Sequence, residues 1–175
     1  MKKRILAILL VMAMLGLTAC DDSSAKELST EDLKNIYQTA GVQAIDEITE
    51  GVTFADPAWT NTISEEGTYH DVYSDLTGTT KSSLTVHSIL YGLGSDVDEA
   101  TAKVEAYREH LLSQGYTEYT PGEDEWFIWD GMFVKEDVAV ILWSSGGRIL
   151  DDEDDGKESV AAGQIPISLE IIPIK

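Results

Sequence analysis

The chain has 175 residues, of which 43% are hydrophobic and 25% are charged, so it can bury a core as one globular domain. Its 32 acidic residues outnumber its 12 basic residues and give a formal net charge of -20. Because proteins bind nucleic acids through clustered Lys and Arg, this balance argues against a nucleic-acid-binding protein. Cys20 is the single cysteine, so no disulfide can form within the chain.

The first twenty residues have the pattern of an export signal. Lys2, Lys3 and Arg4 precede an uncharged apolar run over residues 5–15. That run is shorter than the ~20 residues that a membrane-spanning helix needs, which is typical of a cleaved signal. Residues 17–20 have the sequence Leu-Thr-Ala-Cys, with small residues before the cysteine. This segment resembles the lipobox of bacterial lipoproteins.

The resemblance implies cleavage before Cys20, a diacylglyceryl group on its sulfur, and a protein held by lipid on the extracytoplasmic face of the cell membrane. It divides the chain into a signal peptide (1–19), a lipidated cysteine with a polar tether (20–28) and one globular domain (29–175). The tether would reach ~27 Å when extended. Removal of the signal takes away three positive charges and moves the net charge from -20 to -23. The alternative is a plain secretion signal with an incidental cysteine.

The first half of the mature chain predicts one helix and one hairpin. Apolar residues at three- and four-residue spacing predict a helix over residues 30–49, with Ser29 as its N-cap. Residues 54–67 show no period and predict a loop. Alternating residues predict a β-hairpin formed by 68–76 and 82–91.

The second half predicts a second helix and a run of strands. Residues 96–114 carry an apolar stripe that predicts a helix, with Ser95 as its N-cap. The pattern is typical of an α+β fold, with two helices packed on one face of a largely antiparallel sheet of about five to six strands. A parallel pair across the second helix would make the sheet mixed and is an open alternative. The later strands are expected at 116–120, 126–134, 138–143 and 165–174.

Tryptophans provide the first candidate ligand site. Residues 126–129 have the sequence Trp-Phe-Ile-Trp, which is apolar on both alternating faces of a strand. A strand covered on both sides has this pattern, so core packing is one interpretation. The other is an aromatic platform on which sugar rings or peptides stack, formed by Trp59, Trp129 and Trp143.

An acidic run provides the second candidate site. Asp151, Glu153 and Asp155 occupy the first, third and fifth positions of a segment with Gly156 at the sixth, as in the first half of a calcium-binding EF-hand loop. The second half of that motif does not follow, and strands are expected on either side. The alternatives are a calcium site completed by acids from elsewhere in the fold and a solvated acidic surface.

No catalytic constellation is evident. His70, His87 and His110 fall on separate predicted elements without metal-ligand spacing. We therefore expect a non-enzymatic binding or accessory module of the cell envelope, with an envelope protein or a small-molecule or glycan ligand as partner and no cofactor other than calcium. The alternatives are a glycan-directed hydrolase that uses carboxylates and a calcium-dependent binding module.

Overall fold

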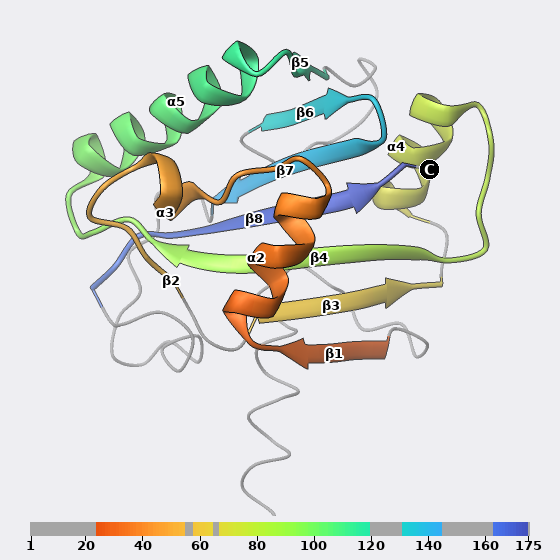
Figure 1. Cartoon of the computed structure of the whole chain (residues 1–175), viewed down its shortest axis with the longest axis horizontal. Helices are drawn as coiled ribbons and strands as arrows, with labels where there is room; N and C mark the ends of the chain where they lie inside the picture. The colour runs from red at the N-terminus through yellow and green to blue at the C-terminus, as the bar shows by residue number, and fades with distance from the viewer. Residues whose placement is uncertain (1–23, 55–57, 65–66, 120–130, 145–162, 175) are drawn as a thin grey trace, which may run out of the picture.

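A computed structural model describes residues 24–54, 58–64, 67–119, 131–144 and 163–174. This part of the chain forms four helices and an eight-stranded sheet (Figure 1). The helices are α2 (Thr30–Thr39), α3 (Ile45–Ile48), α4 (Thr68–Thr77) and α5 (Val97–Ser113). The strands are β1 (Ser24–Leu28), β2 (Thr53–Phe54), β3 (Ala58–Ile63), β4 (Leu84–Gly92), β5 (Thr117–Glu118), β6 (Gly131–Lys135), β7 (Val138–Ser144) and β8 (Pro166–Pro173).

The sheet is antiparallel at every pair of described strands, and its order is β1-β3-β4-β8-β7-β6-β5, with β2 also paired to β4. The predicted α+β class and the antiparallel sheet are therefore confirmed. The prediction of two helices and five to six strands is matched only roughly. The parallel pair left open by the sequence does not occur among the described strands.

The two faces of the sheet carry different helices. Residues directly opposite each other on paired strands share a face, and neighbours along a strand alternate. Ile89, Leu169 and Val140 belong to the core under α2, α3 and α5. Val86 and Ile172 belong to a second core under α4. The two predicted helices do share one face, whereas the unpredicted α4 covers part of the other.

The predicted helix over residues 30–49 is interrupted. α2 ends at Thr39 with Ala40 as its C-cap, and Gly41 follows with a φ of 75°, in the left-handed region that favours glycine. The Val42 amide donates to the carbonyl of Tyr37 and the Gly41 amide to that of Gln38, which closes the helix end. Gly41 therefore terminates a helix rather than weakening the middle of one, and the apolar residues beyond it form the short α3.

The first arm of the predicted hairpin, residues 68–76, is a helix and not a strand. Tyr69, Val72, Tyr73 and Leu76 recur at the spacing of one helical face, and all four pack in the core under α4. Tyr69 and Tyr73 are four residues apart, a spacing that also fits one face of a strand. The second arm is confirmed as β4.

The segment predicted to be a loop, residues 54–67, contains the strand β3. Half of its six residues are polar, residues 59–63 pair with β4, and residues 58–62 pair with β1. Backbone hydrogen bonds to strands on both sides therefore define β3, and such bonds cannot be predicted from the spacing of hydrophobic residues.

Part of the segment predicted to be a tether, residues 24–28, belongs to the sheet. Ser24–Leu28 form the edge strand β1, paired in register with residues 58–62 of β3. The prediction of a tether is therefore wrong for residues 24–28.

The helix predicted over residues 96–114 is confirmed as α5. Its N-cap is Asp96, one residue later than the predicted Ser95, and the Asp96 side chain accepts a hydrogen bond from the amide of Glu99. Within the described residues, no helix is both long and apolar enough to cross a membrane.

A pair of leucine substitutions tests the central position of β8. Leu169 is 0% exposed, whereas Leu112 on α5 is 46% exposed. We expect Leu169→Ala to lower the free energy of unfolding by about 2 to 5 kcal/mol, because it removes buried contacts and leaves a cavity. The matched control Leu112→Ala should change it by less than about 0.5 kcal/mol. Urea unfolding measures both, and similar losses in the two variants would contradict the fold.

Candidate functional site

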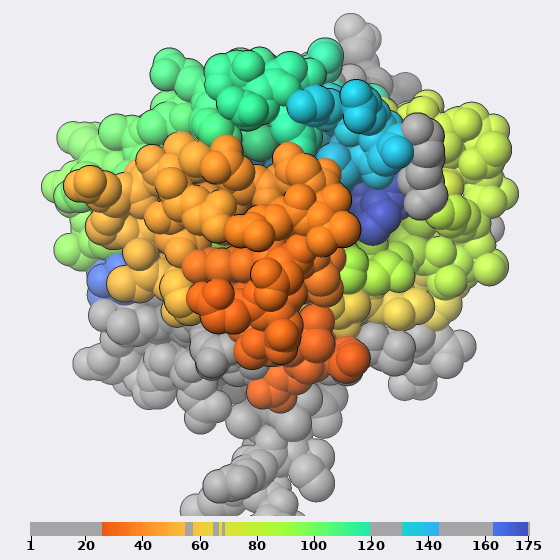
Figure 2. Space-filling model, in the orientation of Figure 1, coloured from red at the N-terminus to blue at the C-terminus, as the bar shows by residue number. Residues whose placement is uncertain are grey.

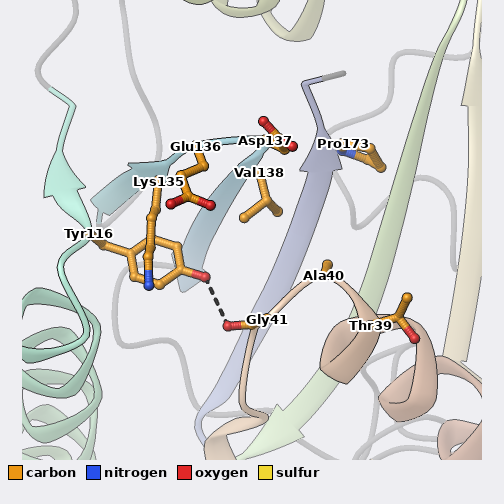
Figure 3. Close-up of a pocket in the computed structure, with 9 residues that line it drawn as sticks. All are labelled: Thr39, Ala40, Gly41, Tyr116, Lys135, Glu136, Asp137, Val138 and Pro173. Carbon is orange, nitrogen blue, oxygen red and sulfur yellow. Dashed lines mark hydrogen bonds between the residues drawn. The ribbon is translucent and has the colours of Figure 1, made fainter.

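A pocket of about 490 Å³ lies at one end of the sheet, where α2 ends beside the β6–β7 hairpin. Figure 2 shows residues of β8 between α2 and this hairpin, and Figure 3 shows the pocket itself. We call it the rim pocket. It is lined by Thr39, Ala40, Gly41, Tyr116, Lys135, Glu136, Asp137, Val138 and Pro173.

The end of α2 and the segment after α5 together form one wall of the rim pocket. The chain turns away at Gly41, which exposes the Gly41 carbonyl. The hydroxyl of Tyr116 donates to this carbonyl at 3.2 Å, the bond drawn in Figure 3. This contact joins residues 75 positions apart in the sequence and holds the Tyr116 ring at the pocket.

The β6–β7 turn forms the opposite wall. Two residues, Glu136 and Asp137, connect the strands, and tight two-residue hairpins require positive φ angles that glycine or asparagine normally supplies. Glu136 has a φ of 48°, and within the described part of the chain no other residue except glycine has a positive φ. Such a conformation costs on the order of 1 kcal/mol or more, and backbone strain of this kind clusters at ligand sites.

Of the charged side chains at the rim pocket, Lys135 has close polar and aromatic partners, whereas Glu136 has no ion-pair partner among the described residues. The Lys135 ammonium donates to the Gln114 carbonyl at 2.8 Å and lies 5.4 Å from the centre of the Tyr116 ring. Figure 3 shows the carboxylate of Glu136 turned toward Tyr116, whereas that of Asp137 points away. Burial raises the pKa of the Tyr116 phenol, and the negative charge of Glu136 raises it further. Glu136 forms no ion pair with any described residue, so its carboxylate is available to a ligand.

A second polar feature lies on the opposite face of the sheet, and we call it the sheet cluster: Tyr69, Ser88, Ser168 and Glu170. The Tyr69 hydroxyl donates to one carboxylate oxygen of Glu170 at 2.7 Å. Ser168 donates to the other at 3.4 Å, and the hydroxyls of Ser88 and Ser168 are 2.8 Å apart. Glu170 is 3% exposed. The cluster therefore connects α4 to the middle of the sheet through a buried carboxyl group.

Burial raises the pKa of Glu170, because a carboxylate loses its hydration in the protein interior. The hydrogen bonds from Tyr69 and Ser168 act in the opposite direction, since they stabilise the charged form. Little of Glu170 is accessible to solvent, so we interpret the sheet cluster as a structural element that fixes α4 and not as a site that contacts ligand.

Two of the three predicted platform tryptophans share the face of the sheet cluster. Trp59 lies directly opposite Ser88, and Trp143 lies directly opposite Ser168. Both are half-buried. They stand on β3 and β7, three strand spacings or ~14 Å apart, with the cluster between them. Trp129 lies outside the described residues.

The other predicted site residues also fall outside the described part of the chain. They are Cys20 and the three acids Asp151, Glu153 and Asp155. Among the described residues, no group of three or more His, Cys, Asp or Glu side chains could hold a metal ion. His70, His87 and His110 lie on α4, β4 and α5, so they are separate as predicted.

Sequence reasoning missed both polar features. Glu170 is the one charge inside the apolar run 165–174, and a lone acid in a doubly covered strand is a signal for a buried carboxyl group. Glu136 has no signal in the sequence beyond its place between the predicted strands 126–134 and 138–143. Its relation to Tyr116 depends on two segments that meet in space and share no local pattern.

No protein-family model matches the chain, and no curated protein or solved structure matches it either. The roles of the site residues therefore rest on the geometry and chemistry of this chain.

The sheet cluster predicts a specific pH dependence of stability. Because the pKa of Glu170 is raised on folding, the folded protein keeps this proton to higher pH than the unfolded chain does. Its contribution to the free energy of unfolding is greatest below the ordinary glutamate pKa and falls as pH rises toward the raised value. We expect the free energy of unfolding of Glu170→Gln not to show this decrease with pH. The decrease in the parent protein should be about 1.4 kcal/mol for each unit by which folding raises the pKa of Glu170.

Urea unfolding of both proteins between pH 4 and pH 7 measures the effect. Glu109→Gln, at an exposed position on α5, controls for the general loss of one negative charge. If the difference between Glu170→Gln and the parent protein were independent of pH, the carboxyl group would not be the buried proton-binding group described here.

Proposed function

We propose that the protein is a lipid-anchored, extracytoplasmic binding module of the cell envelope that takes a cationic ligand in the rim pocket. The anchor is supported by the resemblance of residues 1–20 to a lipoprotein signal. The ligand site is supported by the pocket, whose inward-facing carboxylate has no cationic partner in the described chain.

The ligand class is inferred from the Glu136 carboxylate, which has no ion-pair partner among the described residues. Lys135 is already engaged by Gln114 and Tyr116, so it does not neutralise Glu136. A ligand with an ammonium or guanidinium group could form an ion pair with Glu136. The net charge of -23 left after removal of the signal would attract such ligands over longer distances. The ligand can be a small amine or a basic side chain of an envelope protein.

The geometry favours binding over the alternative of a carboxylate-dependent hydrolase. Such enzymes place two carboxyl groups ~5 to 9.5 Å apart across the bond that they cleave. Glu136 is directed toward the pocket, but its neighbour Asp137 points away in Figure 3. The residues proposed for calcium lie outside the described chain, so calcium binding stays a separate hypothesis and is one arm of the experiment below.

The ligand class is tested by thermal unfolding of residues 21–175 with spermidine, lysine amide or a short Lys/Arg peptide. A compound that binds only the folded state stabilises it by about 2.7 kcal/mol at a hundredfold excess over Kd. We expect these cationic probes to raise the melting temperature. The shift should disappear in Glu136→Gln, which keeps the turn residue's size and removes its charge.

Calcium chloride and neutral glycan fragments are the comparison ligands. A shift with glycans and none with cationic probes would contradict the proposed ligand class. A cationic shift that persists in Glu136→Gln would place binding elsewhere on the acidic surface.

The lipid anchor is tested by Cys20→Ala in the full-length chain. Without the thiol that takes the lipid, we expect the protein to move from the membrane fraction to the soluble fraction of the cell. Asp22→Ala, two residues further on, should leave the protein in the membrane fraction. Membrane retention of Cys20→Ala would contradict the lipoprotein proposal.

A further inference from the structure

The pairing of β1 limits how far the folded domain can stand from a lipid on Cys20. β1 begins at Ser24 and pairs with β3 at five consecutive positions, Ser24 with Thr62 through Leu28 with Ala58. Four Cα–Cα steps separate Cys20 from Ser24. Even a fully extended chain covers no more than ~14 Å over that length. The reach is therefore about half of the ~27 Å expected for a free tether of residues 21–28.

The attachment point lies at one extreme of the sheet. β1 is the first strand in the order β1-β3-β4-β8-β7-β6-β5, so six strand spacings, or ~29 Å, separate it from β5. Figure 1 shows β1 at one end of the molecule and β5 with the end of α5 at the other. If the chain is anchored beside β1, the β1 edge of the sheet is close to the anchor and the β5 edge is far from it.

Charge disfavours a posture in which the helices lie against lipid. α2 and α5 carry six acidic and three basic residues, and all six acids are exposed. Each of the three basic side chains is in an ion pair with acidic neighbours: Lys34 with Asp46, Lys103 with Glu99, and Arg108 with Glu105 and Glu118. Anionic headgroups repel a surface of this kind.

We infer that the lipid on Cys20 holds the β1 edge of the sheet against the bilayer surface, with the β5 edge directed away from it. This inference rests on the lipid anchor of the proposed function. The strand residues of the rim pocket belong to β8, β7 and β6, three to five spacings from β1, or ~14 to 24 Å. The pocket therefore stays within ~40 Å of the lipid surface and meets ligands or partners at the same membrane.

Energy transfer from single dyes to acceptor-labelled lipid headgroups tests this posture. The full-length lipidated protein is purified from membranes and placed in vesicles that contain anionic lipid. Once Cys20 carries lipid it has no free thiol, so Lys26→Cys on β1 or Thr117→Cys on β5 provides the single labelling site. Both positions are exposed. We expect the transfer efficiency at position 26 to be at least twice that at position 117.

A matched variant lengthens the tether. Twelve Gly/Ser residues inserted after Ser23 add a flexible segment with an end-to-end distance of ~20 Å. The efficiency at position 26 should then fall toward the value at position 117. Melting temperatures of the labelled variants close to that of the parent protein show that the fold is intact.

The outcomes separate the posture from the anchor. Equal efficiencies at positions 26 and 117, or no response to the insertion, would overturn the posture while vesicle binding still supported the anchor. A protein that carries no lipid on Cys20 by mass spectrometry and does not sediment with vesicles would overturn the anchor and the posture together.

Discussion

Insertion of β8 between β4 and β7 is the constraint on which the rest of the structure depends. The N-terminal half supplies β1, β3 and β4, and the later half supplies β7, β6 and β5. β8, at the end of the chain, pairs with both groups and joins them into one sheet. Seven of its eight residues are buried. Ser88 and Ser168, eighty residues apart in sequence, meet only because this strand is in place.

The same strand positions both polar features. Pro173, at its end, lines the rim pocket, and Glu170, at its middle, accepts the hydroxyl of Tyr69 from α4. On the other face, the Tyr37 hydroxyl of α2 donates to the carbonyl of Leu169 at 2.6 Å. One strand thus holds a helix on each side. The rim pocket lies at one end of the sheet, where the β6–β7 turn is next to the end of α2.

The sequence predicts the elements whose periodicity is clear and misses those defined by partners. α5, β7 and β8 have strong apolar patterns and were predicted within one or two residues. α4 was mistaken for a strand because its aromatic residues satisfy both periods over a short span. β1 and β3 lack a clear apolar alternation, and their conformation depends on hydrogen bonds with neighbouring strands, which composition does not encode.

Prediction of the sites fails for a related reason. The tryptophans and the acidic run are recognisable from composition alone, so the sequence predicts ligand sites there. Glu136, which has no ion-pair partner in the described part of the chain, and the buried Glu170 become distinctive only through their surroundings. Their partners, Tyr116 and Tyr69, are distant in sequence, and non-local pairs of this kind follow from topology.

The central claim is that residues expected to form a tether form the edge strand β1, which shortens the path from the proposed anchor to the domain. Hydrogen exchange of the amides in Ser24–Leu28 tests it most directly. If β1 pairs with β3 as described, the β1 amides that bond to β3 will exchange far more slowly than an unstructured peptide, although faster than those of β8. Exchange at the unstructured rate throughout Ser24–Leu28 would contradict the account and restore the longer, free tether.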